Sequence, residues 1–303
     1  MFKHLLVPLD GSSLAEAALP AAATLAQKLG ASVTLVHVTE QDAPQEIHGQ
    51  HHLADPDEAY AYLDEVAGRV FPSGVHVEQH VHSAPVSDVA RSIVAHEDEL
   101  EPDLIVMCTH GQSGLRTRLF GSIAQQVIAV GTTPILLIQP FKGGVVREFA
   151  CRRLLMPLDG DPDHAQGLPV AAGLAQAYGA NLHLVMVVPT LSTLPGQDGT
   201  AARLLPGATS AVLDLAQDDA EAYLREQVAQ LQAEGLLVTA AVQRGDAATT
   251  IVRTAEQINA DLVVLGTHGR TGMEAFWSES VVPQVIGRAP VPLLLVPVHR
   301  SVT

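Results

Sequence analysis

The chain carries one sequence unit twice, and this internal repeat constrains the fold more than any other feature. Two early segments, residues 5–12 (LLVPLDGS) and 25–38 (LAQKLGASVTLVHV), return at one constant offset as LLMPLDGD and LAQAYGANLHLVMV. Two later segments, residues 102–114 (PDLIVMCTHGQSG) and 133–140 (TPILLIQP), return at a larger offset as ADLVVLGTHGRTG and VPLLLVPV. The second copy therefore contains extra residues, which we assign to a loop at 189–210 that is rich in Pro, Gly, Ser and Thr.

The repeat divides the chain of 303 residues into two domains. Roughly 100–200 residues per domain is the usual size, so the length agrees with this division. We expect the first domain at residues 1–143 and the second at residues 150–303, joined by a short linker. Hydrophobic residues make up 47% of the chain, which is enough for a sizeable core in each domain.

Apolar periodicity within each copy alternates between strands and helices. Residues 5–9 are a continuous apolar run ending in Asp-Gly, as expected of a strand buried on both faces. Residues 14–29 have helical spacing, with Ser12 or Ser13 as the N-cap and Gly30 as the end. Further strands are expected at 33–38, 75–81, 104–108 and 134–138, and further helices at 56–70, from Pro85 and from Ser122. The sequence predicts an α/β fold of two tandem Rossmann-like domains, each a five-stranded parallel sheet with helices on both faces.

The charge of the chain excludes several classes of partner. Asp and Glu outnumber Lys and Arg by 33 to 17, which gives a formal net charge of −16. Such an acidic surface repels phosphate backbones and anionic lipids, so we expect no nucleic-acid and no membrane partner. The two cysteines, Cys108 and Cys151, are too few for a disulfide framework, and no targeting signal is visible, so a cytoplasmic protein is indicated.

Two segments that follow predicted strands indicate a ligand site, because open parallel sheets bind ligands at the carboxyl ends of their strands. The first is residues 10–12, where the Asp10 carboxylate accepts hydrogen bonds and suits ribose hydroxyls. The second is the glycine-rich segment 108–122, which opens into a helix whose N-terminus favours an anion. In the alternative interpretation, Gly111 and Gly114 only make turns and Asp10 only caps a helix.

Together these motifs resemble the universal stress protein family. The resemblance rests on the Val-Pro-Leu-Asp-Gly start, the Thr-His-Gly loop and the closing Pro-Ile-Leu-Leu-Ile strand, and it covers almost the whole chain. It implies domains of the adenine nucleotide alpha hydrolase-like type and a stress-associated regulatory protein with little or no catalytic turnover. Members of one kind hold ATP, with or without Mg²⁺, on the pattern G-x₂-G-x₉-G-[ST], and members of the other kind do not.

In the first copy the resemblance implies a nucleotide site with one departure from this pattern. Its positions are occupied by Cys108, Gly111, Gly121 and Ser122, so a cysteine replaces the first glycine. Asp10 matches the acidic residue on the ribose side, and Val38 matches the residue whose backbone meets adenine. A positive φ at Cys108 would cost about 1 kcal/mol or more. Arg116 and Arg118 lie in the spacer, where they either steer the phosphates or form a solvated face.

The second copy departs from the pattern at its other end. The matching residues are Asp159, Gly266, Gly269 and Ser280, but Glu279 replaces the last glycine. A carboxylate at this helix N-terminus would take the place of the phosphate and repel it. We therefore expect the first copy to bind ATP better than the second, which binds it weakly or not at all.

The sequence gives little support for catalysis. It has no Walker lysine and no recognisable nucleophile with its base, so at most weak ATP hydrolysis is expected. His110 and His268 could shuttle protons, although a structural role in their loops is favoured. An alternative function is an interaction module that has lost nucleotide binding and contacts an unidentified protein. The two copies are expected to pair as a pseudo-dimer through residues 134–138 and 292–296, with a homodimer as a further alternative.

One histidine-rich strand suggests a metal hypothesis. His76, Glu78, His80 and His82 alternate in sequence, so they point to one face of the strand. Against this, an edge strand exposes polar residues to solvent without any ligand, and the second copy has no comparable cluster. We assign no metal ligand from the sequence and leave the His76/His80/His82 face as an alternative. Cys108 and Cys151 are expected to be unreactive thiols rather than a redox pair.

Overall fold

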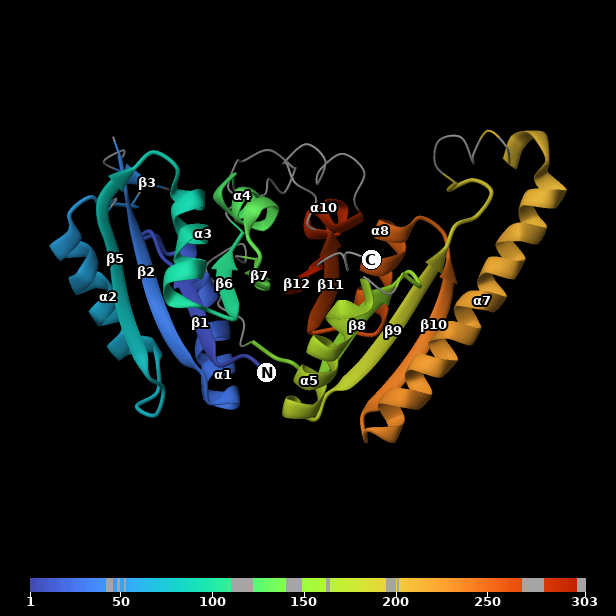
Figure 1. Ribbon diagram of the computed structural model, residues 1–303, viewed down its shortest axis with the longest axis horizontal. Coiled ribbons are helices and arrows are strands. Elements are labelled where there is room, and N and C mark those ends of the chain that lie inside the picture. The colour runs from blue at the N-terminus through green and yellow to red at the C-terminus, as the bar shows by residue number, and fades with distance from the viewer. Residues whose placement is uncertain are drawn as a thin grey trace. The chain divides into compact units, whose positions relative to one another are not determined.

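A computed structural model of the protein describes most of the chain (Figure 1). The described residues are 1–41, 46–47, 50–51, 53–109, 122–139, 149–161, 164–194, 200, 202–268 and 281–298. They form two compact units. The described part of the first unit lies within Met1–Phe149 and Pro292–Pro297, and that of the second lies within Ala150–His268, 281–291 and Val298.

The first unit is built on a sheet that contains the parallel strands in the order β7-β6-β1-β2-β5. These strands are β1 (His4–Pro8), β2 (Ser32–Glu40), β5 (Val77–Val86), β6 (Leu104–Cys108) and β7 (Ile135–Ile138). Leu5 of β1 is paired with Val33 of β2 and with Leu104 of β6, and all three side chains are fully buried. Residues of β12 (Leu293–Val298) that belong to this unit pair antiparallel with β7. A two-stranded ribbon, β3 (Glu46–Ile47) and β4 (Gln50–His51), is separate from this sheet.

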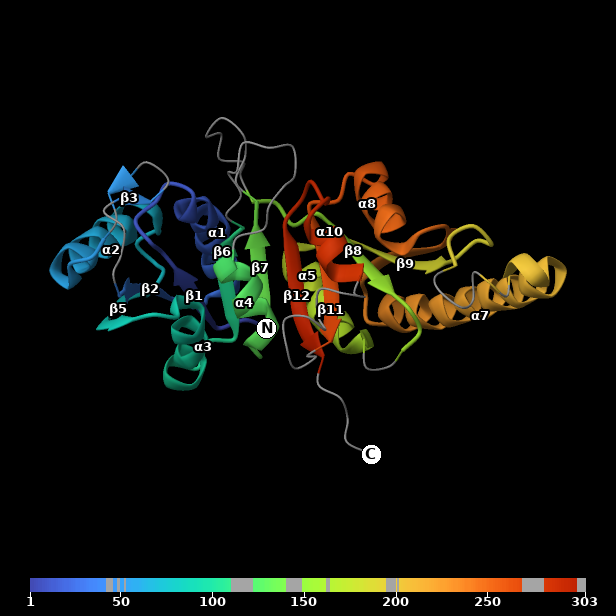
Figure 2. The same cartoon turned by 90° about the horizontal axis from the view of Figure 1, so that it is seen from above.

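Helices cover both faces of the sheet, as predicted. They are α1 (Leu19–Leu29), α2 (Pro56–Val70), α3 (Val89–Leu100) and α4 (Ser122–Val130). Figure 2 shows α1 and α2 on one face and α3 and α4 on the other, and α3 packs against α4. The observed bounds of α2 agree with the prediction because its start is well marked. The Asp55 side chain accepts hydrogen bonds from the N–H groups of Asp57 and Glu58, and Pro56 takes the first helical position.

Two helix starts differ from the prediction. The predicted helix at 14–29 begins with a 3₁₀ turn, η1 (Ala15–Ala18), and becomes α-helical at Leu19, because Pro20 lacks an N–H and fits only the first turn of a helix. The helix expected from Pro85 begins at Val89, where the Asp88 side chain accepts a hydrogen bond from the N–H of Arg91. Pro85 is part of β5, since an edge strand tolerates a missing backbone donor.

The second unit repeats this plan with the strand order β10-β9-β8-β11. Its strands are β8 (Arg153–Leu158), β9 (Asn181–Val188), β10 (Leu237–Arg244) and β11 (Leu262–His268). Its helices are η2 (His164–Gly167), α5 (Leu168–Tyr178), α7 (Pro206–Ala233), α8 (Ala247–Gln257) and α10 (Val281–Ile286). Among the described residues, no helix is both long enough and apolar enough to cross a membrane.

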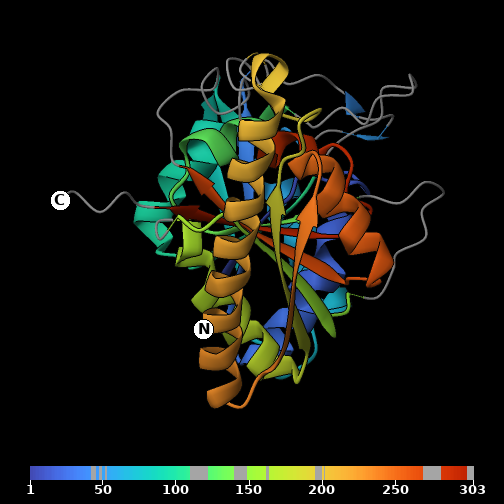
Figure 3. The same cartoon turned by 90° about the vertical axis from the view of Figure 1, so that its right-hand side faces the viewer.

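The extra length of the second copy is not confined to a loop. Helix α7 has 28 residues where α2 has 15, and residues 206–210, which composition assigned to the loop, form its first turns. Composition misled here because Pro206 and Gly207 lie in the first turn, where proline is favoured and glycine is tolerated. Figure 3 shows α7 running beside β9 and β10, the strands that it packs against.

Candidate functional site

The Asp-Gly turn after the first strand has the same geometry in both units. The N–H of Ser12 donates to Asp10 Oδ1 at 2.9 Å, and the N–H of Asp161 donates to Asp159 Oδ1 at 3.0 Å. Gly11 and Gly160 both have a φ of 85°, a conformation that glycine adopts without a steric penalty. Asp10 therefore stabilises a turn, whereas Ser12 caps the helix by accepting a hydrogen bond from the N–H of Ala15 at 3.2 Å.

A cavity in the first unit opens at the carboxyl ends of β1, β2 and β6. Its volume is about 620 Å³ when the open solvent at its mouth is included. The residues that line it are Pro8, Leu9, Asp10, Ala15, Val36, Val38, Glu40, Val89, Ile93, Met107, Cys108 and Ile123. Its position agrees with the rule that an open parallel sheet binds ligands at this edge.

The cavity brings three predicted site residues together, Asp10, Val38 and Cys108. Its wall is mostly aliphatic, and among the described lining residues only Asp10 and Glu40 carry a charge. A flat apolar group fits such a wall, and the two carboxylates accept hydrogen bonds from hydroxyls. This combination matches the chemistry of a nucleoside.

Several lining residues were missed by the sequence analysis. Val36 and Glu40 alternate with Val38 along β2, so the two-residue period of a strand could have identified them. Ile93 of α3 and Ile123 of α4 come from helices whose packing on the sheet sets their position. No periodicity in the sequence marks these two isoleucines as cavity residues.

The glycine-rich loops lie largely outside the described residues. In the first copy this applies to Gly111, Gly121, Arg116, Arg118 and His110. In the second copy it applies to Gly269, Glu279 and Ser280. Ser122 is described as the exposed first residue of α4, directly before the lining residue Ile123.

The cysteine that replaces the first glycine does not need a glycine's conformational freedom. Cys108 is the last residue of β6, and among the described residues only Glu101 and Asn259 have a positive φ without being glycine. Gly266 of the second copy likewise lies within a strand, β11, and is absent from the glycines with positive φ. The backbone penalty considered for Cys108 therefore does not arise, and its side chain instead adds volume to the cavity wall.

Both thiols are expected to react slowly in the folded protein. Cys108 and Cys151 are free and each is 2% exposed. Burial raises the pKa of each to about 12, with a smaller contribution from Asp10 for Cys108 and from Asp261 for Cys151. The reactive thiolate is then a minor species at pH 7.4, so alkylation by iodoacetamide should be at least 100-fold slower than in the denatured chain. Mass spectrometry of a time course checks this, and rapid labelling of native Cys108 would contradict it.

The second unit surrounds its Asp-Gly turn with different side chains. Met186 occupies the position of the first copy's His37, and its Cε lies 3.5 Å from where a Cβ would stand on Gly160. Tyr223 of α7 is near Asp159: burial raises the pKa of this hydroxyl first, and the Asp159 charge raises it further. The two copies thus differ around the turn as well as at Glu279.

The histidines of β5 are only partly brought together. His76, directly before β5, and Glu78 are hydrogen-bonded to each other at the surface at 3.0 Å. His80 and His82 instead face His96 of α3, with ring centroids 4.7 Å and 5.3 Å from its ring. The strand lies at an edge of the sheet, as predicted, yet His80 and His82 are half-buried rather than simply solvated.

The fold defines a tandem α/β protein with a cavity at the carboxyl edge of the sheet of its first unit. The sequence profile of the universal stress protein family matches residues 1–139 and 150–297. The chain therefore belongs to the universal stress protein family, and the predicted tandem membership is confirmed.

The relatives include proteins that match the whole chain and shorter proteins that match about half of it. A universal stress protein of Mycobacterium tuberculosis is 26% identical over 307 residues, which cover 95% of each chain. One from Synechocystis is 30% identical over 166 residues, covering 54% of this chain and 96% of its own. A universal stress protein structure from Archaeoglobus fulgidus aligns with a TM-score of 0.68 at 20% identity, covering 97% of this chain and 96% of that one. The structure of a putative universal stress protein from Pseudomonas aeruginosa aligns with a TM-score of 0.69 at 17% identity, covering 98% of this chain and 94% of that one. These structures support the fold.

Proposed function

We propose that the first copy of this stress protein binds an adenine nucleotide, ATP with or without Mg²⁺, in the cytoplasm. The observation that carries the proposal is the cavity at the strand ends, which Asp10, Val38 and Cys108 line together. Nucleotide binding would stabilise the first domain by linkage and so alter the surface that an unidentified protein partner contacts.

The residues of the cavity fit the parts of a nucleoside. Val36 and Val38 of β2 line the same cavity as Ile93 and Met107, and these four side chains offer an apolar site for adenine. Asp10 would accept hydrogen bonds from the ribose hydroxyls. Ser122, at the N-terminus of α4, belongs to the end of the helix that favours phosphate through its unpaired N–H groups and dipole.

We propose binding with at most weak hydrolysis. The sequence has no Walker lysine and no recognisable nucleophile with its base.

Equilibrium dialysis against labelled ATP and magnesium tests the function. We expect one nucleotide per chain, and we expect Val38→Trp to weaken binding at least tenfold because the indole fills the apolar side of the cavity. The matched control is Val187→Trp, the same position in the second copy, which should leave the affinity unchanged. No binding at millimolar ATP would refute the proposal, and equal losses in both variants would refute the assignment to the first copy.

A second candidate function is an interaction module of the same fold. It is favoured by exposed apolar residues before and within the first half of α7, which a solvated helix would not need. These are Leu204, Leu205, Val212 and Leu215, exposed by 76%, 64%, 62% and 64%.

From the repeat we also propose that residues 134–138 pair with residues 292–296. The pairing would form either a pseudo-dimer within one chain or a homodimer of two chains. Sedimentation analysis of the full chain would distinguish the two.

A further inference from the structure

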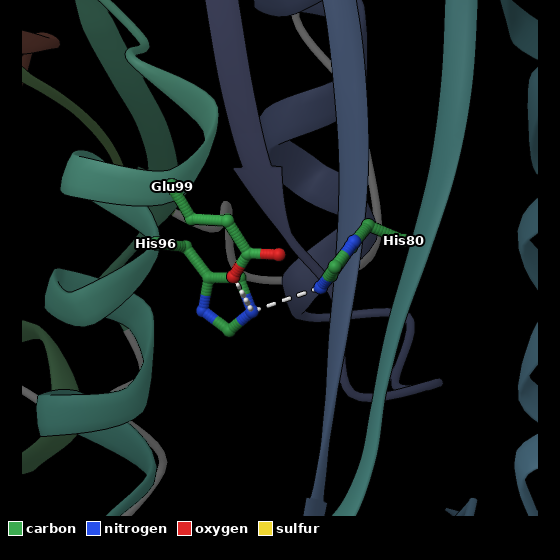
Figure 4. A group of neighbouring side chains, drawn as sticks. All are labelled: His80, His96 and Glu99. Atoms are coloured by element: carbon green, nitrogen blue, oxygen red, sulfur yellow. Dashed lines mark hydrogen bonds and ion pairs between the residues drawn. The ribbon is translucent and has the colours of Figure 1, made fainter.

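Three ligand-type side chains from two elements of the first unit meet beside β5, as Figure 4 shows. They are His80 of β5 and the pair His96 and Glu99 of α3, and one ligand atom from each lies within 4.8 Å of the others. His96 Nε2 is 2.9 Å from His80 Nε2 and 3.8 Å from Glu99 Oε2. The cluster is separate from the cavity, since the described residues that line the cavity include none of the three.

His96 is oriented as metal-binding histidines usually are. Its side chain is 2% exposed, and its Nδ1 lies 2.5 Å from the carbonyl oxygen of Ser92. A carbonyl only accepts, so Nδ1 carries the proton and, in the neutral ring, the Nε2 lone pair points at His80 and Glu99. A hydrogen bond from the second nitrogen to a backbone carbonyl is the common way in which proteins fix the tautomer of a metal ligand.

The local folding of α3 explains how the set is assembled. His96 and Glu99 are three residues apart on the helix, so both side chains lie on the same face. The Asp88 cap fixes where this helix begins, and β5 pairs in regular register with β2 at His80. The strand and the helix therefore hold the ligands from two sides.

We propose that His80, His96 and Glu99 form a binding site for a divalent transition metal ion, with Zn²⁺ as the best match. Two imidazole nitrogens and one carboxylate are a familiar zinc ligand set that keeps a fourth position for water. Nitrogen donors favour zinc, copper or nickel over magnesium and calcium, which prefer oxygen. The inference does not depend on nucleotide binding.

The distances require only small adjustments. Zn–N bonds of about 2.0–2.1 Å in a tetrahedral arrangement separate two nitrogens by roughly 3.3 Å, so the His80 and His96 rings must part by a few tenths of an ångström. Glu99 must approach by about half an ångström, which its 60% exposed side chain permits. His82, whose ring centroid is 5.3 Å from that of His96, is next to the site and could supply the fourth ligand.

The two imidazole rings share a hydrogen bond, and the metal would replace this bond.

Metal titration of the full-length, metal-free and untagged chain tests the site. We expect Zn²⁺, measured against a chromophoric chelator, to bind with a Kd of micromolar or below, and Co²⁺ to give the absorption bands of a four-coordinate nitrogen–oxygen site. His80→Gln and Glu99→Gln each remove one ligand at a partly exposed position and should weaken binding at least tenfold. They are preferred to substitution of the buried His96, whose loss could also unfold the helix.

The matched control is His76→Gln, directly before the same strand and hydrogen-bonded to Glu78 at the surface. It should bind zinc as the wild type does. The proposal is overturned if no metal binds at 100 µM zinc (a concentration of about 100 times the expected Kd), or if His80→Gln and Glu99→Gln bind as tightly as His76→Gln. Cobalt bands that persist in both ligand variants would place the metal elsewhere and overturn it equally.

Discussion

Replacing Gly121 by glutamate should remove measurable ATP binding from the chain. The substitution copies Glu279, which stands at the matching position of the second copy. A carboxylate about 5 Å from a phosphate charge costs about 3 kcal/mol at an effective dielectric constant of about 20. A cost of this size weakens binding by about two orders of magnitude, and the carboxylate also competes for the N–H groups of the helix end.

The reciprocal substitution provides the sharper control. Glu279→Gly restores the glycine to the second copy, and we expect it to raise the number of nucleotides per chain from one to two. Met186 and Tyr223 still differ from the first copy, so the new site should be the weaker of the two. Isothermal titration of the wild type and both variants measures affinity and stoichiometry together. Unchanged affinity in Gly121→Glu would show that the charge at this position does not control binding.

Local signals in the sequence predicted much of the fold. The segment 56–70 carries an Asp-Pro start, and the observed helix has those bounds. Gly30, predicted as the helix end, has the left-handed conformation that such a cap requires. The errors at Pro85 and Pro206 share one cause: the effect of proline depends on whether its neighbours need a backbone donor, which is a property of the assembled sheet or helix.

The sequence predicted the site residues that lie near the ends of strands, but not those that tertiary packing brings to the site. Asp10, Val38 and Cys108 lie at or near the carboxyl ends of three strands, and the topology of a parallel sheet brings strand ends together. Ile93 and Met107 reach the same cavity through tertiary packing, and His96 meets His80 from another element. The histidine alternation on β5 identified one side of the proposed metal site, but the two ligands from α3, His96 and Glu99, have no signal in that pattern.

Substitution of His37 by alanine should strongly destabilise the first domain. The ring is 1% exposed and lies between two carbonyl oxygens, with Nδ1 2.9 Å from that of Leu9 and Nε2 3.0 Å from that of Leu53. A neutral imidazole has one N–H and donates to one of these carbonyls, so alanine would remove that hydrogen bond and would create a cavity. Together these effects cost about 3–5 kcal/mol.

The same ring supports the candidate nucleotide site indirectly. Leu9 precedes Asp10, and the Leu53 side chain packs so closely on Gly11 that a Cβ there would lie 2.9 Å from it. Loss of His37 therefore loosens the turn that positions Asp10, because the ring contacts both Leu9 and Leu53. We expect the variant to bind ATP more weakly even at temperatures where the domain remains folded.

A second variant separates the hydrogen bonds from the cavity. His37→Met introduces the residue that the second copy has at this position, Met186, and largely fills the space. It should cost about 1–3 kcal/mol through the lost hydrogen bond from the ring, which lowers the melting temperature by roughly 3–10 °C. Met186→Leu, a volume-conserving change in the other copy, should cost less than about 1.5 kcal/mol. If differential scanning calorimetry finds His37→Met as stable as the wild type, hydrogen bonding by the His37 ring does not contribute to the stability of the domain. Packing alone would then hold the segment 9–11 in place.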